Sequence, residues 1–404
     1  MHIALLTLRI PWPLRDGGAQ ATWGHAQLLR EMGHRLTMLT LNTRKHRQEP
    51  AVLAELGTVV TTDIDTSLRP LAALQSLLGS TGYNIDRFYS PEHANRIEQT
   101  LLRDPADIVL LEGVYLAQYL PAIWAALPDV PVVLRAHNVE FEIWQRLARA
   151  ERNPLKRWYY GHLARRGEAF ERQSLKQFDG LLAITPRDLA HFQALGYTGA
   201  SMWLPALYTG PLAAPPQVGS GAQQIGFLGS LDWLPNVQAL DWFRQQVWPR
   251  VRERLPEATF HLAGRNAPRE VAHWQAPGWL FRGEVEDAGA FLAGLDVVAV
   301  PLLAGSGMRL KLVEALARGK AVVASPVAAE GIWPLPQAGG DAPLLLAETP
   351  EEWAHTLARL ITQPAKRQAL GQAGLAHVAN HFQASGVQMA YGRWLQALVA
   401  NNAA

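Results

Sequence analysis

The sequence has 404 residues, 49% of them hydrophobic and 18% charged, which allows large buried cores. At about 150 residues per domain this length predicts two or three domains, and we take two. No apolar run reaches the roughly 18 residues of a membrane-spanning helix. The lack of Cys excludes disulfides, thiolate catalysis and cysteine metal sites, and a net charge of +2 is too balanced to indicate a nucleic-acid partner.

The N-terminal segment MHIALLTLRIPWPL resembles a first core strand. It lacks the basic segment and the small-residue cleavage site of a secretory signal. We therefore expect a cytoplasmic protein.

The first half of the chain alternates short apolar runs with helical periodicities. Such alternation is typical of a parallel, doubly wound sheet covered by helices. The runs lie at residues 2–8, 35–41, 58–64, 107–113, 131–137 and 180–185. We therefore predict an α/β domain with a Rossmann-like sheet.

A pair of glycines, Gly17 and Gly18, follows the first predicted strand and directly precedes a helix beginning near Ala19. Two glycines at this place either form a simple turn or let the backbone approach a phosphate or a sugar. The sequence leaves both interpretations open.

The segment from Trp144 to Lys176 is basic and aromatic. It carries nine Lys and Arg against three acidic residues, interleaved with aromatic side chains. Such a helical stretch either lies on anionic lipid or is a solvated face whose aromatic rings turn into the core.

Residues 205–222 break all periodicity with Pro, Gly and Ala, and we predict the linker between the domains there. The alternation then restarts, so we predict a second α/β domain. Its apolar runs lie at residues 224–230, 258–264, 278–283, 296–302 and 320–326. Residues 350–400 look helical, with a break near Gln383–Gly386.

Residues 301–325 read as a strand end, a glycine turn, a helix and another strand. Arg309 and Lys311 stand in the first turn of this helix, where two cations normally oppose the helix dipole. Their placement therefore predicts a diphosphate between them, bound also by the free N–H groups of the helix. Glu314 follows one turn later and can accept two hydroxyl hydrogen bonds, as from a ribose. A plain packing helix with solvated charges is the alternative.

Several segments together carry a resemblance to a known family. They are the diglycine loop, RAHNVEFEIW (135–144), GFLGSLDWLPN (226–236), GEVED (283–287) and GSGMRLKLVEALARGKAVVAS (305–325). With them the chain resembles the bacterial retaining glycosyltransferases of the large family-4 type, the glycosyl transferases of group 1, which have the GT-B architecture.

The resemblance implies a particular division of the chain. Residues 1–206 would form an acceptor-binding Rossmann-like domain and residues 207–380 a nucleotide-sugar-binding one, facing each other across a cleft. Residues 381–404 would form a helix that packs back on the first domain.

Carried over by position, Glu314 matches the second Glu of the family's E-x7-E motif, which is expected on the nucleotide ribose. Ser306 replaces the first Glu, so we expect donor-sugar contacts from the backbone of Gly305–Met308. Base recognition is expected around Glu284 and Val285.

The family's phosphate-binding cations after the first strand of the second domain are missing from this sequence. Arg309 and Lys311 are the expected replacements, assisted by Arg265. The residues expected around the donor diphosphate and sugar are Gly17, Gly18, Gly229, Ser230, Arg265, Gly305, Ser306, Gly307, Met308, Arg309 and Lys311.

His137 corresponds by position to the histidine that faces the donor sugar in this family. A lone His beside a strand is more often structural, so its predicted catalytic role rests on the resemblance. Asn138 and Glu140 follow on the same loop, where they either bind acceptor hydroxyls or cap the loop.

The resemblance implies front-face substitution, in which the leaving phosphate accepts the proton of the acceptor. It implies no cofactor beyond the co-substrate, a UDP- or GDP-sugar, and no metal. Asp63 and Asp65 spell the D-x-D of metal-dependent enzymes, but they follow a short strand where Asp is an ordinary capping residue.

The sequence leaves two alternatives to a transferase open. A nucleotide-sugar epimerase on the same fold would turn over its donor without an acceptor. A non-catalytic, two-lobed protein would bind sugar nucleotides without turnover. The expected acceptor is a glycan, a lipid-linked saccharide or a small molecule, and a lipid-linked one would require peripheral contact with the inner face of the membrane.

Overall fold

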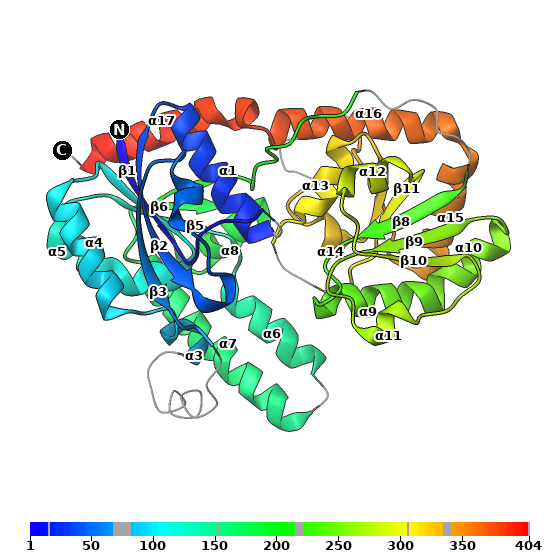
Figure 1. Ribbon diagram of the computed structural model, residues 1–404, viewed down its shortest axis with the longest axis horizontal. Coiled ribbons are helices and arrows are strands. Elements are labelled where there is room, and N and C mark those ends of the chain that lie inside the picture. The colour runs from blue at the N-terminus through cyan, green and yellow to red at the C-terminus, as the bar shows by residue number, and fades with distance from the viewer. Residues whose placement is uncertain are drawn as a thin grey trace. The chain divides into compact units, whose positions relative to one another are not determined.

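Two parallel β-sheets, each in its own unit of the chain, form the framework of the structure (Figure 1). The structure is a computed structural model that describes residues 1–14, 17–67, 82–151, 153–214, 222–304, 307–333 and 341–402. Unit 1 comprises Met1–Leu207 and Val387–Ala404, and unit 2 comprises Tyr208–Gly386.

The sheet of unit 1 has seven strands in the order β3-β2-β1-β4-β5-β6-β7, and its pairs are parallel. Its strands are β1 (His2–Thr7), β2 (Arg35–Thr43), β3 (Thr58–Ile64), β4 (Ile108–Glu112), β5 (Val132–Ala136), β6 (Gly180–Ala183) and β7 (Ala200–Trp203). The four central strands β1, β4, β5 and β6 are buried along their whole length, as their apolar runs predict.

Helices connect the strands of unit 1. They are α1 (Gly17–Glu31), α3 (Tyr83–Asp86), α4 (Pro91–Arg103), α5 (Leu120–Ala126), α6 (Glu140–Ala150), α7 (Pro154–Leu175) and α8 (Pro186–Ala194), with short 3-10 turns at Arg44–His46, Pro50–Leu53 and Val114–Tyr119.

The last helix, α17 (Ala384–Asn402), closes the core of unit 1. Tyr391 and Leu395 are fully buried, and Leu398 is nearly so. Gly180 lies so close to Trp394 that an added Cβ would stand 2.7 Å from its ring. The glycine that begins β6 therefore makes room for the ring of α17.

The sheet of unit 2 has six strands in the order β10-β9-β8-β11-β12-β13, and its pairs are also parallel. Its strands are β8 (Gln224–Leu228), β9 (Thr259–Ala263), β10 (Trp279–Gly283), β11 (Val297–Val300), β12 (Ala321–Ala324) and β13 (Leu345–Leu346). The predicted fold class of two doubly wound parallel-sheet domains is confirmed.

The helices of unit 2 surround this sheet. They are α9 (Leu234–Trp242), a π-helical turn at Phe243–Val247, α10 (Trp248–Arg254), α11 (Arg269–Ala272), α12 (Ala288–Ala293), α13 (Leu310–Ala317), α14 (Pro326–Ala329), α15 (Pro350–Thr362) and α16 (Pro364–His381). The predicted helical ending is confirmed, and its last break falls between α16 and α17.

Several helices begin at the same local signal, a capping Ser, Thr or Asn followed by Pro. The cap side chain accepts a hydrogen bond from a backbone N–H of the first turn, and Pro tolerates the first helical position because it needs no N–H bond there. The pairs are Ser90-Pro91, Asn153-Pro154, Thr185-Pro186, Ser325-Pro326 and Thr349-Pro350.

Candidate active site

A cavity of about 150 Å³ lies in unit 1 where the strand order reverses, between β1 and β4. Ligands of open parallel sheets bind at such a point, beyond the carboxyl ends of the strands. The cavity is lined by Thr7, Leu8, Arg9, Pro11, Gly18, Ala19, Thr22, Glu112 and His137. The structure thus brings two of the predicted site residues, Gly18 and His137, to one cavity, and Gly17 begins the same helix as Gly18.

Glu112, the last residue of β4, is the centre of a buried hydrogen-bond network in this unit. The strand register pairs it with Arg135 on β5, and both side chains are only 1% exposed. Its Oε2 accepts from Arg135 Nη1 at 2.9 Å, from His137 Nε2 at 2.5 Å and from the Thr22 hydroxyl at 3.3 Å. Its Oε1 bonds His25 Nδ1.

The network extends from Glu112 to the last helix through His25. The Nε2 atom of His25 lies 2.8 Å from the hydroxyl of Tyr391 on α17. Both residues are buried, at 1% and 0% exposure. A chain of side chains therefore links α17 to His137.

Burial and charge fix the protonation states along this chain. Burial raises the pKa of Tyr391 and lowers the pKa of His25, so the phenol is protonated and the imidazole is neutral. Burial opposes ionisation of Glu112, but the charge of Arg135 and the hydrogen bonds of the two histidines outweigh it. They hold the pKa of Glu112 well below its usual value, so the carboxylate is ionised.

The predicted acceptor residues bond to each other. Asn138 Nδ2 donates to Glu140 Oε1 at 3.2 Å, and the Tyr115 hydroxyl donates to Glu140 Oε2 at 3.2 Å. Burial raises the pKa of Glu140. Neither residue lines the cavity, so their role toward an acceptor stays a prediction.

The strand order of unit 2 reverses between β8 and β11, and predicted donor residues follow the strands near this point. Gly229 follows β8 and Gly264 follows β9, and a Cβ on Gly264 would stand only 2.0 Å from the carbonyl oxygen of Gly229. Only glycine permits this approach. The Nε of Arg265 then donates to the Ser230 hydroxyl at 2.9 Å.

The start of α13 lies beside the loop after β8. Arg309 is the N-cap residue of α13, and Gly307 before it has a φ of +76°. The Arg309 guanidinium donates to the Gly307 carbonyl at 3.1 Å and lies 5.2 Å from the centre of the Trp233 ring. Met308 between them is nearly buried, while Gly305 and Ser306 lie outside the described residues.

Two of the predicted nucleotide ligands on α13 are paired with each other. Lys311 Nζ lies 2.9 Å from Glu314 Oε2, and Arg318 lies 3.7 Å from Glu314 Oε1. Gly319, at the end of this helix, has the positive φ of +65° that the predicted C-cap requires. The roles of Lys311 at phosphate and Glu314 at ribose stay predictions.

Glu284 and Val285 follow β10, the edge strand next to β9. Glu284 is exposed and Val285 is half-buried. Gly283 before them has a φ of +69°, so the chain turns sharply at the end of the strand. Their predicted contact with the nucleotide base stays a prediction.

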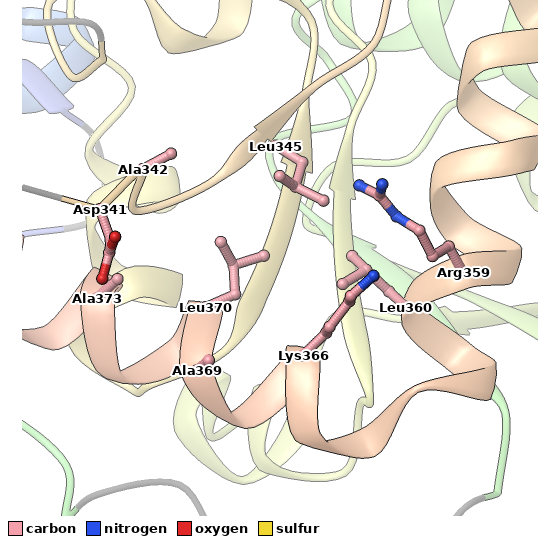
Figure 2. A pocket seen from close by; sticks show the side chains of 9 residues that line it. All are labelled: Asp341, Ala342, Leu345, Arg359, Leu360, Lys366, Ala369, Leu370 and Ala373. Atoms are coloured by element: carbon pink, nitrogen blue, oxygen red, sulfur yellow. The ribbon is translucent and has the colours of Figure 1, made fainter.

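Another cavity, of about 240 Å³, lies in unit 2 between β13, α15 and α16 (Figure 2). It is lined by Asp341, Ala342, Leu345, Arg359, Leu360, Lys366, Ala369, Leu370 and Ala373. None of these is a predicted donor residue.

Asp63 and Asp65, the two aspartates of the D-x-D sequence, each contact neighbouring polar side chains. Asp63 accepts from Asn42 at 2.9 Å and from Arg47 at 2.8 Å, and Asp65 lies 3.6 Å from Arg44. Within the described parts of the chain, no group of three or more His, Asp or Glu side chains could hold a metal ion. Likewise, no helix among the described residues is long and apolar enough to cross a membrane.

The sequence interpretation missed Glu112, Arg135, His25 and Tyr391. A signal for the first two was present, because each is a charged residue inside an otherwise apolar strand, and charges are rarely buried unless paired. No local signal connects His25 with Tyr391, which are 366 positions apart.

Two family profiles match most of the chain. The "Glycosyl transferase 4-like domain" matches residues 16–202, and "Glycosyl transferases group 1" matches residues 222–363. No curated protein sequence gave a match.

Solved structures of similar fold cover nearly the whole chain. Sucrose-phosphate synthase from Thermosynechococcus elongatus has a TM-score of 0.68 at 15% identity, over 99% of this chain and 100% of its own. HepE from Anabaena, in complex with UDP, has a TM-score of 0.65 at 13% identity, over 98% and 100%. TarM from S. aureus, in a complex that includes UDP, has a TM-score of 0.65 at 8% identity, over 98% and 99%. At these identities the likeness shows the fold.

Proposed function

Because the chain belongs to the glycosyl transferases of group 1 and is thus a glycosyltransferase, we propose that it moves a sugar from a nucleotide diphosphate to a hydroxyl acceptor, with retention of the anomeric configuration and without a metal. The observation that carries this proposal is the cavity at the switch point of unit 1, where His137 is held by a buried, ionised carboxylate. The cation-bearing start of α13, near the switch point of unit 2, supports it.

The donor is proposed to lie against the loop after β8 and the start of α13. Arg309, Lys311 and Arg265 supply cations, and preorganised cations and helix N–H groups stabilise the charge that develops on a departing diphosphate. The backbone of residues 305–308 is proposed to contact the donor sugar. Since the neighbouring HepE and TarM structures contain UDP, a UDP-sugar is the first donor to test and a GDP-sugar the second.

The proposed reaction is a front-face substitution. The bond from the anomeric carbon to the diphosphate oxygen breaks, the acceptor oxygen forms its bond on the same face, and its proton passes to the leaving phosphate. Glu112 is the carboxylate among the described lining residues of the cavity, and its bonds to four donors make it a poor nucleophile. Proton NMR of the first product should show the anomeric configuration of the donor, and an inverted product would contradict the mechanism.

Removal of one cation of the donor site should weaken nucleoside diphosphate binding about tenfold or more, because each charged hydrogen bond contributes about 1.5–3 kcal/mol. Arg309→Ala and Lys311→Ala should therefore lose affinity for UDP and almost none for uridine. Isothermal titration measures both, and GDP and guanosine replace them if the wild type prefers GDP. Lys366→Ala removes an exposed cation at the second cavity and should bind as the wild type does.

Glu314→Gln should weaken nucleoside and diphosphate alike, because it acts on the ribose. A 2′,3′-dideoxy diphosphate should then bind wild type and variant with similar affinity. If Arg309→Ala, Lys311→Ala and Glu314→Gln all bind the diphosphate as the wild type does, the start of α13 is a packing turn and the proposed donor site is wrong.

The acceptor is proposed to be a glycan or a lipid-linked saccharide, with peripheral contact to an anionic membrane surface. Helices α6 and α7 form a helical pair that extends beyond the sheet of unit 1 (Figure 1). At the start of α7, Leu155 is 73% and Trp158 is 52% exposed, and the exposed Lys156 and Arg157 stand between them. Apolar side chains beside cations suit the boundary of an anionic bilayer.

The wild type should therefore co-sediment with vesicles rich in anionic lipid and not with neutral ones. Leu155→Ser/Trp158→Ser should lose this binding, whereas Leu102→Ser, which replaces a leucine 58% exposed on α4, should keep it. Absence of wild-type binding to anionic vesicles would remove membrane contact from the proposal and leave the transferase activity untouched.

A further inference from the structure

We propose that Glu112 is a positioning residue that sets the tautomer of His137, and that His25 and Tyr391 hold Glu112 in place from the last helix. The inference rests on the proposed function in one respect, namely that His137 acts on the donor sugar. It goes beyond that function because it assigns a role at the site to a helix from the far end of the chain.

The direction of each hydrogen bond follows from which side-chain groups can donate a proton and which can only accept one. The protonated Tyr391 hydroxyl donates to Nε2 of the neutral His25, which leaves the proton of His25 on Nδ1, where it faces Glu112. The ionised carboxylate only accepts, so the His137 nitrogen 2.5 Å away must carry a proton. Neutral His137 is therefore protonated on Nε2.

The tautomer of His137 decides which of its ring nitrogens can bond a ligand in the cavity. With Nε2 committed to Glu112, Nδ1 carries the lone pair, and it makes no hydrogen bond to a described residue. A neutral His137 thus offers an acceptor on Nδ1 to a sugar hydroxyl. If the proton sat on Nδ1, the ring would offer a donor instead, and the lone pair on Nε2 would face the carboxylate.

The arrangement around Glu112 also keeps the carboxylate from rotating. Arg135 and His137 bond one oxygen and His25 bonds the other, so both oxygens are held. Gly113, with a φ of +113°, turns the chain directly after Glu112. Side chains of β5 and α1 thus bond directly to the one carboxylate at the end of β4, and Tyr391 of α17 is linked to it through His25.

Glu112→Gln is the first test, because it keeps the shape of the side chain and replaces one acceptor by an N–H donor. Arg135 can only donate, so the amide oxygen stays in the place of Oε2 and the NH2 group takes the place of Oε1, where His25 must turn its lone pair toward it. His137 then keeps an acceptor for Nε2 but loses the charge of that acceptor, and we expect kcat to fall about tenfold and the donor KM to change by less than about threefold. In ¹⁵N NMR spectra, the His25 proton should move from Nδ1 to Nε2, and the His137 proton should stay on Nε2.

Tyr391→Phe is the second test. It still tests the proposal if the Glu112→Gln protein does not fold because the charge of Arg135 has lost its carboxylate. It removes the donor to His25 and keeps the buried ring, and we expect kcat to fall about five- to tenfold. Tyr119→Phe is the matched control, because Tyr119 is also fully buried and donates at 2.7 Å, but to the carbonyl of Phe88. It should lower the melting temperature and leave kcat unchanged.

The NMR signal of His137 is identified by its loss in His137→Ala, and its measurement needs no substrate. A wild-type His137 protonated on Nδ1 overturns the inference, as does a folded Glu112→Gln protein with wild-type kcat. Equal kcat for Tyr391→Phe and Tyr119→Phe shows that α17 has no part in it. If His137→Ala retains full activity while the tautomer is as assigned, the proposed role of His137 has failed and the positioning by Glu112 stands.

Discussion

His137→Ala is expected to lower turnover by roughly 100-fold or more and to change nucleotide affinity little. His137 lines the cavity of unit 1, whereas the predicted phosphate ligands Arg309 and Lys311 belong to unit 2. In the proposed function, the substitution removes a group at the donor sugar and leaves the cations at the diphosphate in place. Steady-state kinetics and isothermal titration with the nucleoside diphosphate measure the two effects separately.

The fold should survive this substitution, because Glu112 keeps three of its donors in Arg135, His25 and Thr22. His355→Ala, which replaces an exposed histidine of α15, is the control and should behave as the wild type. An equal loss of nucleotide binding in His137→Ala would show that this histidine is placed wrongly in the proposed function.

Deletion of residues 384–404 is expected to unfold unit 1. It removes Tyr391, Leu395 and Leu398, all buried, from the core. The loss of each large buried side chain costs about 2–5 kcal/mol, and their sum approaches the whole stability of a domain, about 5–15 kcal/mol. Circular dichroism and thermal melting of the truncated chain should show the loss of cooperative unfolding of this unit.

A single substitution tests the same packing without truncation. Leu395→Ala should destabilise unit 1 by about 2–5 kcal/mol and lower its melting temperature by about 4–20 °C. Met389→Ala on the same helix should change it little, because Met389 is 73% exposed. A truncated protein that melts and reacts as the full chain does would contradict the packing of α17 on unit 1.

The sequence predicts most strands of both sheets to within a few residues, because buried parallel strands are continuous apolar runs bounded by polar turns. Two edge strands, β7 and β13, lie outside the predicted apolar runs. β7 has no fully buried residue, and β13 has only two residues, of which Leu346 is exposed. Such strands owe their conformation to the neighbouring strand rather than to their own pattern.

The candidate site was predictable only in part. Gly18 and His137 follow strands that end at the same edge of the sheet, so the pattern of the sequence places them together. The residues that hold His137 could not be predicted in this way. Glu112 meets Arg135 because the register of two strands places them side by side, and His25 meets Tyr391 through tertiary packing. Neither relation is encoded in a spacing along the chain.

The division of unit 1 into two pieces of chain has a consequence for biosynthesis. Domains ordinarily fold from the N-terminus during translation, as each leaves the ribosome. Here Val387–Ala404 leave the ribosome after all of unit 2, and until then Gly180 lacks Trp394 and His25 lacks Tyr391. Unit 2 can therefore fold while the core of unit 1 still lacks the side chains of α17. A chain whose synthesis stops before α17 therefore has an incomplete N-terminal core, which exposes it to proteases, and only a chain that includes α17 can assemble the full set of hydrogen bonds around His137.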